Sequence, residues 1–240
     1  MENIQQIDLD INKSTSISIV ACGADINLDS KVWAINWFDT KRKWLYNIYT
    51  AIASRFVVQV GGRLCFKGAF METLSGDEKD ARKILLIVAY PTAHHFLDLV
   101  KMKLFQMVSI LRILAVKRFV FGFTQRLKIE KLTKNRQTKG APCLVHHFRN
   151  EASVNEKIEL VCHLANEQNI HLSYAGLKVA TLRRSHSTED SYDVPFIMDG
   201  ILVFEADNKG QLMAFYESEL YKSFTETLDN SYVALFRKLA

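Results

Sequence analysis

Two stretches of this chain carry the same pattern of apolar residues at a constant spacing. Lys83 to Thr124 aligns without a gap with Asp199 to Ala240, an offset of 116 residues. The shared positions include Leu85–Val88 against Ile201–Phe204, Phe96 against Leu212, Leu99 against Phe215, and Val120 against Phe236. Self-similarity over this length predicts that one structural unit occurs twice in the chain.

Hydrophobic periodicity predicts the same order of elements in both halves. In the first half, strands are expected at 32–38, 63–73, 83–90 and 120–124, and helices at 41–58 and 92–114. In the second half, strands are expected at 144–148, 170–184, 194–206 and 232–239, and helices at 153–167 and 210–230. The chain then divides into an N-terminal extension (1–31), a first β-α-β-β-α-β unit (32–124), a basic linker (125–141) and a second unit (142–240).

A β-α-β-β-α-β unit is a ferredoxin-like sandwich, in which a four-stranded antiparallel sheet carries both helices on one face. The strand at 83–90 has too many consecutive apolar residues for its other face to be solvated. We therefore predict an α+β fold of two tandem ferredoxin-like units packed sheet to sheet. This arrangement is an intramolecular dimeric α/β barrel, and a monomer is expected because the sheet faces are covered within one chain.

The composition is that of a globular protein with a substantial core, because 48% of the 240 residues are hydrophobic and 24% are charged. The four cysteines lack CxxC spacing and the seven histidines lack metal-ligand spacing, so no metal site or disulfide framework is predicted. No phosphate-binding glycine pattern or Gly-x-Ser-x-Gly elbow occurs, and no cofactor is predicted. The acidic N-terminus is unlike a secretory signal, so a cytoplasmic location is expected.

Charge is distributed unevenly along the chain. Residues 1–139 hold 22 Lys and Arg against 12 Asp and Glu, whereas residues 140–240 hold 9 against 14. Within the segment 101–139, 11 basic residues accompany one acidic residue. One interpretation is a solvated helix face followed by a hydrophilic linker. The other is a surface for an anionic partner, nucleic acid or lipid, formed by Lys128, Lys131, Lys134 and Arg136.

A family resemblance is carried by the start of the second strand and the end of the third. Gly61-Gly62-Arg63, and Tyr90-Pro91-Thr92 running into Ala93–Leu97, resemble the domain of unknown function 1330 of the dimeric α/β barrel superfamily. The resemblance covers 32–124 and, more weakly, 142–240. The superfamily includes cofactor-independent monooxygenases, muconolactone isomerase, chlorite dismutase-like heme proteins and stress-responsive proteins. The resemblance implies a fold and no single reaction.

Two adjacent histidines are the candidate catalytic residues. Strand alternation places His147 on one face with Cys143 and Val145, and His146 on the other with Leu144 and Phe148. The two side chains therefore cannot bind one metal ion together. A neutral histidine among apolar residues can act as a general base, although a hydrogen-bonded structural histidine has the same pattern.

Five residues in the first half are candidates for ligand binding: Asn36, Trp37, Tyr49, Arg63 and His95. Each has a structural alternative. Trp44, Tyr46 and Tyr49 have helical spacing that is typical of core residues. Arg63 is expected to pair with a substrate carboxylate or with a neighbouring acid such as Glu72.

Two classes of function follow from these features. The first is a small-molecule protein that binds or converts an aromatic or acidic compound without a cofactor, as a monooxygenase or isomerase does. The second is a non-enzymatic interaction or scaffold protein that binds an anionic partner through the basic segment 101–139.

Overall fold

A computed structural model describes residues 6–12, 15–21, 27–129, 138–149, 155–184, 194–195 and 199–240. The chain divides into two compact units, each assembled from separate stretches of sequence. Unit 1 comprises Met1–Phe66, Arg82–Gln125 and Lys178–Phe196, and unit 2 comprises Lys67–Ala81, Arg126–Leu177 and Ile197–Ala240.

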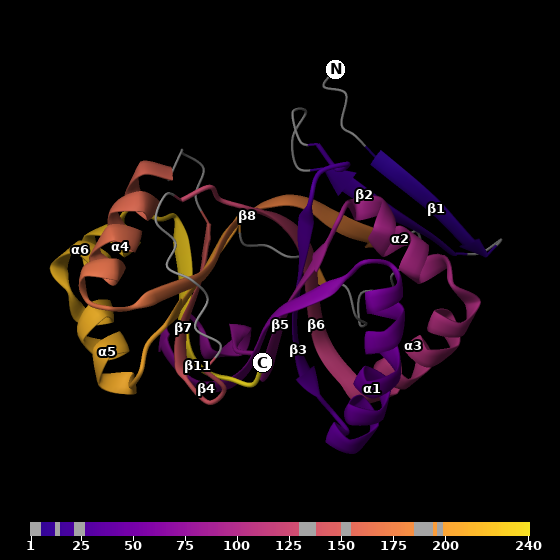
Figure 1. The fold of residues 1–240 in the computed structure, drawn as a ribbon, viewed down its shortest axis with the longest axis horizontal. Helices are drawn as coiled ribbons and strands as arrows, with labels where there is room; N and C mark the ends of the chain where they lie inside the picture. Colours follow the sequence, from indigo (N-terminus) through magenta and orange to yellow (C-terminus); the bar gives the residue numbers. More distant parts are fainter. Residues whose placement is uncertain are drawn as a thin grey trace. The chain divides into compact units, whose positions relative to one another are not determined.

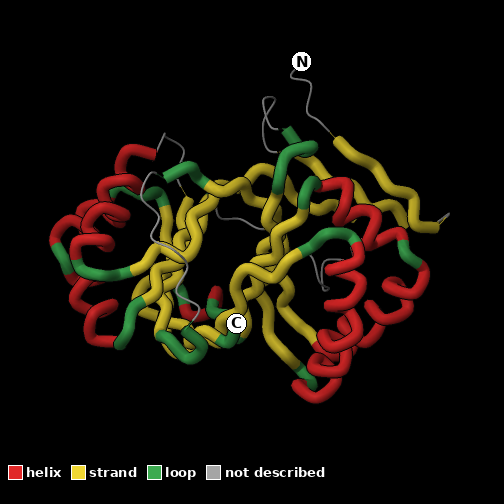
Figure 2. The backbone as a smooth tube through the Cα atoms, in the orientation of Figure 1, coloured by secondary structure: helices red, strands yellow, loops and turns green. Residues whose placement is uncertain are grey.

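The elements alternate between strands and helices along the chain (Figures 1 and 2). Unit 1 contains β1 (Gln6–Asn12), β2 (Thr15–Ala21), β3 (Val32–Thr40), α1 (Lys43–Gln59), β5 (Ile84–Tyr90), α2 (Ala93–Lys101), α3 (Lys103–Ala115), β6 (Val116–Arg126) and β9 (Val194–Pro195). Unit 2 contains the short 3-10 helix η1 (Glu78–Asp80), β7 (Pro142–Arg149), α4 (Asn155–Glu167), β10 (Gly200–Glu205), α5 (Lys209–Glu217), α6 (Glu219–Glu226) and β11 (Asn230–Lys238). Two long strands, β4 (Arg63–Ser75) and β8 (His171–Arg184), contribute residues to both units. The predicted succession of strands and helices is present in each half, but the strand expected at 194–206 is divided into β9, which pairs with β6, and β10.

The strands form one sheet, which corrects the predicted fold. Their hydrogen-bonded order is β1-β2-β8-β10-β7-β11-β4-β5-β3-β6-β9, and an additional β8–β6 pairing closes the eight strands from β8 to β6 into a barrel. The expectation of two self-contained ferredoxin-like units packed sheet to sheet is therefore wrong. The physical reason is the length of β4 and β8, because a strand of 13 or 14 residues extends beyond its own four-stranded sheet.

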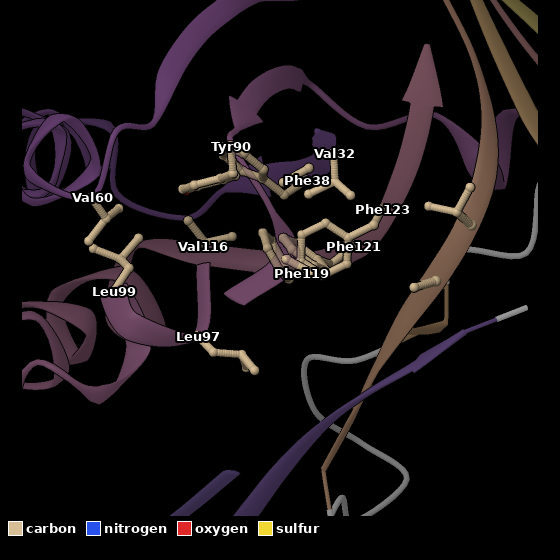
Figure 3. Packing of buried hydrophobic residues seen from close by; sticks show 14 of the residues in the cluster. Val32, Phe38, Val60, Tyr90, Leu97, Leu99, Val116, Phe119, Phe121 and Phe123 are labelled. Carbon is tan, nitrogen blue, oxygen red and sulfur yellow. The ribbon is translucent and has the colours of Figure 1, made fainter. Parts of the chain in front are cut away.

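Alternation along the strands builds the core of unit 1 on the face that carries its helices. Aromatic side chains from neighbouring strands and α2 form a packed cluster, and the centroids of the Phe96 and Phe121 rings lie 5.2 Å apart. Figure 3 shows this cluster, with Phe119, Phe121 and Phe123 of β6 on one side of their strand. Val32, Ala34 and Phe38 of β3 belong to the same cluster, so alternate residues of that strand face the helices.

The core of unit 2 has the same construction. Leu144 and Phe148 of β7 and Leu202 and Phe204 of β10 pack beneath the helices α4, α5 and α6. Aromatic contacts continue into the helices, where the ring centroids of Phe204 and Phe215 lie 4.9 Å apart. Leu127 and Ile129 of the predicted linker pack against this cluster.

Each half was expected to have one long second helix, and in each half this helix is interrupted. In unit 1 the interruption is Met102, with a backbone ψ of 117°, and in unit 2 it is Ser218, with a ψ of 146°. The N–H of Met102 returns to the carbonyl of Leu99, and that of Ser218 returns to the carbonyl of Phe215. Leu99 and Phe215 are both buried, so the chain bends where its apolar face meets the core.

The N-terminal extension contributes a hairpin to the sheet. β1 pairs with β2, and β2 pairs with the Ala180–Arg184 end of β8. Within the described ranges, no helix combines the length and apolar character needed to cross a membrane.

Candidate functional site

His146 and His147 point to opposite faces of the unit 2 sheet, as the alternation of β7 predicts. His146 lies opposite Leu202 of β10 and Val233 of β11, on the face covered by helices. His147 lies opposite Ile201 and Tyr232, on the other face. Both imidazoles are fully buried. Neither histidine can therefore exchange protons with solvent in this conformation.

His146 is held by a tyrosine within a group of aromatic rings. Its Nδ1 lies 2.8 Å from the hydroxyl oxygen of Tyr221 on α6. The rings of Phe148, Tyr221 and Phe224 surround it, with centroid distances of 5.8, 5.7 and 5.6 Å. This imidazole is a polar group in an otherwise apolar, aromatic environment.

The second nitrogen of His146 decides what the site can do. Nε2 is buried and has no hydrogen-bond partner among the described residues. If Tyr221 donates its O–H to Nδ1, the ring proton is on Nε2 and a single N–H is unsatisfied. If Nδ1 donates instead, both the tyrosine O–H and Nε2 are left unpaired. Because each unpaired buried polar group costs about 1–3 kcal/mol, the first arrangement is favoured, and His146 presents an N–H donor.

Burial fixes the protonation of both histidines. It lowers the pKa of His146 from 6.5 to about 3. Burial, reinforced by the neighbouring His146, likewise lowers the pKa of His147 to about 3. Burial also raises the pKa of Tyr221 well above its usual value of 10. The pair is therefore neutral at physiological pH, and an imidazolium is strongly disfavoured in this environment.

A buried ion pair in unit 2 was missed in the sequence. The Nζ of Lys238 on β11 lies 2.6 Å from Oε2 of Glu205 on β10, which also accepts a hydrogen bond of 2.9 Å from Ser173. Burial, reinforced by the Glu205 carboxylate, raises the pKa of the nearby Cys143 thiol to about 12. The available signal was Glu205 directly after the apolar run Ile201–Phe204. The paired charges and the protonated thiol indicate a structural cluster.

A second missed cluster lies in unit 1. Asp39 is fully buried and pairs with the guanidinium of Arg118 on β6, and its Oδ1 accepts a hydrogen bond of 2.9 Å from the N–H of Lys83. Arg82 places its guanidinium 5.8 Å from the centroid of Trp37 and donates from Nε to the carbonyl of Arg118. These contacts connect β3, β6 and the start of β5.

The structure does not bring the five ligand candidates of the first half together. Trp37 is buried beside Arg82, on the face of β3 opposite the helix-side cluster. Asn36 donates from Nδ2 to the carbonyl of Ala34, 3.2 Å away. Tyr49 is partly buried in the helix-side cluster, where burial raises its pKa.

The remaining candidates lie on or near the surface. Arg63 is exposed at the start of β4, and its expected alternative partner Glu72 pairs instead with Lys209. His95 is tied through Nδ1 to the Thr92 hydroxyl, 2.9 Å away, at the start of α2. Lys128 is exposed, whereas Lys131, Lys134 and Arg136 lie outside the described residues.

A heme group does not fit the helix side of unit 2. Phe148, Phe215, Tyr221 and Phe224 are all at most 3% exposed, and their ring centroids approach to 4.9–6.3 Å. These rings occupy the space that a porphyrin would need between the sheet and α5/α6. In the part of the chain that the structure describes, no group of three His, Cys, Asp or Glu side chains is arranged to hold a metal ion.

Comparison with known proteins identifies the fold. No protein-family model matches the chain, and no curated protein matches it. A putative monooxygenase from Fusobacterium nucleatum is 12% identical, with 88% of this chain and 93% of that chain covered and a TM-score of 0.55. A putative monooxygenase from Lactobacillus acidophilus is 9% identical, with coverages of 88% and 95% and a TM-score of 0.52.

A mutant chlorite dismutase from Candidatus Nitrospira defluvii is 12% identical, covers 89% of this chain and 92% of its own, and gives a TM-score of 0.52. The chain shares its fold with these three proteins. Identities this low establish the fold and leave the reaction open.

Proposed function

We propose that unit 2 binds a small, uncharged aromatic molecule that carries a hydrogen-bond acceptor, beside His146, in space that opens when the Phe224 side chain of α6 moves. The observation that carries the proposal is the unpaired Nε2–H of His146 among aromatic rings. An unpaired buried donor calls for a partner, and a ligand carbonyl oxygen would supply one. The surrounding rings favour an aromatic ligand, and their low polarity disfavours a charged one.

The site supports binding better than conversion. A general base works best with a pKa near the operating pH, whereas burial lowers the pKa of His146 to about 3. Its Nδ1 is also occupied by the Tyr221 hydroxyl. His146 therefore acts as a hydrogen-bond donor to the ligand, and Tyr221 orients it. The ligand enters by displacing the Phe224 side chain of α6, a helix of eight residues.

The fold is consistent with a small-molecule role. The similar structures include proteins named as monooxygenases and a chlorite dismutase, and these names refer to small-molecule chemistry. Those activities belong to the named proteins. For this chain they support a ligand-binding role, and the aromatic preference rests on the residues around His146 alone.

The test is binding of acetophenone, an aromatic ketone, compared with ethylbenzene, which has the same ring without the acceptor. We expect acetophenone to bind the wild-type chain about tenfold more tightly, because one hydrogen bond to a buried donor contributes about 1–1.5 kcal/mol. Titration followed by the imidazole ¹⁵N resonances of His146 measures both the affinity and the nitrogen engaged.

The His146→Phe variant removes the donor and keeps an aromatic ring of similar volume. It should bind the two compounds equally, whereas His163→Phe on the exposed face of α4 should keep the preference for acetophenone. The proposal fails if the wild type binds acetophenone and ethylbenzene equally, or if neither compound shifts the Nε2 resonance of His146. Phe224→Ala, which opens space beside the imidazole, should tighten binding of acetophenone and tests the entry route.

We further infer that the two halves of the chain, 32–124 and 142–240, arose by duplication of a domain related to the domain of unknown function 1330. Strand register supports this inference: Leu85 pairs with Trp37 and Ile201 pairs with His147, and Leu85 and Ile201 are separated by the 116-residue offset. The interruptions at Met102 and Ser218 are separated by the same offset. The division at 32–124 and 142–240 belongs to this proposal.

A further inference from the structure

The helices α1 and α3 of unit 1 carry an unusual outer face. Nine large apolar side chains on these two helices are exposed: Trp44, Ile48, Ile52, Val58, Leu104, Met107, Ile110, Ile113 and Leu114. We name these nine residues the α1/α3 surface. Trp44, Leu104 and Met107 are 63%, 64% and 65% exposed. The two helices are neighbours (Figure 1). The ring centroids of Phe56 on α1 and Phe105 on α3 lie 6.1 Å apart.

This outer face is not required by the core. α1 already buries Leu45, Tyr46 and Ala53 against the sheet, so Trp44 and Ile48 lie on a different side of the helix. Unit 2 supplies an internal comparison, because among its described helical residues only Leu160 and Leu220 are large, apolar and exposed. Contiguous exposed apolar surfaces of this kind mark interaction sites.

Charge identifies the partner. α1 and α3 contain no Asp or Glu, whereas the unit 2 helices α4, α5 and α6 contain six acidic residues: Glu156, Glu159, Glu167, Glu217, Glu219 and Glu226. Lys43, Arg55 and Lys103 are exposed beside the apolar residues and form no ion pair with any other described residue. A second copy docked through its own α1/α3 surface would place these cations against one another. An anionic membrane surface would instead neutralise them.

We propose that the α1/α3 surface docks on the surface of a bilayer that contains anionic lipid. The apolar side chains enter the boundary between headgroups and acyl chains, as in amphipathic helices that lie in the membrane plane. Trp44 occupies the interfacial level that tryptophan prefers, and Lys43, Arg55 and Lys103 contact lipid phosphates. This inference rests on unit 1 and is independent of the ligand proposed for unit 2. The proposed contact site differs from the basic segment 101–139, because only its helix α3 lies within that segment.

The experiment measures sedimentation of the full chain with phosphatidylcholine vesicles, with and without phosphatidylserine. We expect binding only to the anionic vesicles, with a blue shift of tryptophan fluorescence that is lost in Trp44→Phe. The double variant Met107→Glu/Ile110→Glu should bind at least about tenfold more weakly, because it places charge in the apolar region. The triple variant Lys43→Gln/Arg55→Gln/Lys103→Gln should weaken binding by a similar factor and reduce its sensitivity to salt.

A matched control carries the same type of substitution on unit 2. Leu160→Glu/Leu220→Glu exchanges exposed leucines on α4 and α6 and should bind like wild type. All substituted residues are exposed, and circular dichroism checks that each variant keeps the fold. The triple variant also keeps the apolar surface intact. Equal binding by wild type and Met107→Glu/Ile110→Glu would overturn the proposal. The proposal would also be overturned if the wild type forms concentration-dependent dimers that this variant abolishes, and does not bind vesicles. That result would assign the surface to a second copy.

Retention of the chain on a nucleic acid duplex is the third outcome. If the triple Gln variant loses such retention while Met107→Glu/Ile110→Glu keeps it, the cations serve nucleic acid and the lipid proposal is wrong.

Discussion

Single residues in this protein behave according to the environment that the fold gives them. His146 and His147 are neighbours in sequence, yet one contacts Tyr221 beneath the helices and the other lies opposite Tyr232 on the far face of the sheet. Both are fully buried and neutral. Trp44 and Tyr46 were both expected in the core, but only Tyr46 is buried. Helical spacing identifies a face, and the sheet decides which face is covered.

Stability should depend on pH through the two buried histidines. Their pKa is about 3 in the folded chain against an ordinary value of 6.5, so the unfolded chain takes up protons that the folded chain does not. The free energy of unfolding should therefore fall as the pH is lowered from about 6.5 toward about 3, by roughly 1 kcal/mol per pH unit for each histidine. Above pH 6.5 this contribution stays constant.

Urea denaturation at a series of pH values checks this expectation. The double variant His146→Phe/Tyr221→Phe removes one of the two histidines together with its partner, and it should lose about half of the slope. His163→Phe serves as the control on the surface of α4. A slope that the double variant leaves unchanged would mean that His146 does not make this contribution.

At the scale of elements, short backbone features set where helices end. α4 ends in a left-handed residue, Asn169, with φ 55°, and the N–H of Ile170 closes the turn on the carbonyl of Ala165. This is the arrangement of a helix C-terminus with the left-handed residue just beyond the end. The turn delivers the chain directly into β8, so its geometry positions the first residues of that strand.

Asn169→Ala should lower the free energy of unfolding by about 1 kcal/mol, because alanine is strained in the left-handed region. Asn169→Gly should have little effect, since glycine adopts this conformation freely. Asn166→Ala, within the exposed part of α4, is the control and should stay within about 0.5 kcal/mol of wild type. Equal losses for Ala and Gly at position 169 would mean that the asparagine side chain, and not the backbone conformation, is what matters.

At the scale of the whole molecule, the strand order removes the free edges of eight strands. The ring from β8 through β10, β7, β11, β4, β5 and β3 to β6 is closed by the β8–β6 pairing. Free edges are a common route to strand pairing between chains, and closure eliminates it for these strands. The formal net charge of +5 also opposes self-association.

The chain should therefore be a monomer of 27.5 kDa in dilute solution. Light scattering coupled to size exclusion measures this mass directly, at low and at moderate ionic strength. A mass about twice as large would contradict the expectation, and Met107→Glu/Ile110→Glu would then show whether the α1/α3 surface holds the two copies together.

The sequence by itself determined the order of the elements and the two faces of each strand. It did so because these features depend on local periodicity, such as the alternation of Leu144, His146 and Phe148. Tertiary structure alone decided the closed strand order, since β4 and β8 extend beyond their own unit to reach further partners. It also decided the Glu205–Lys238 pair, the aromatic group around His146 and the exposure of Trp44. These features bring together residues distant in sequence, and no local pattern encodes such contacts.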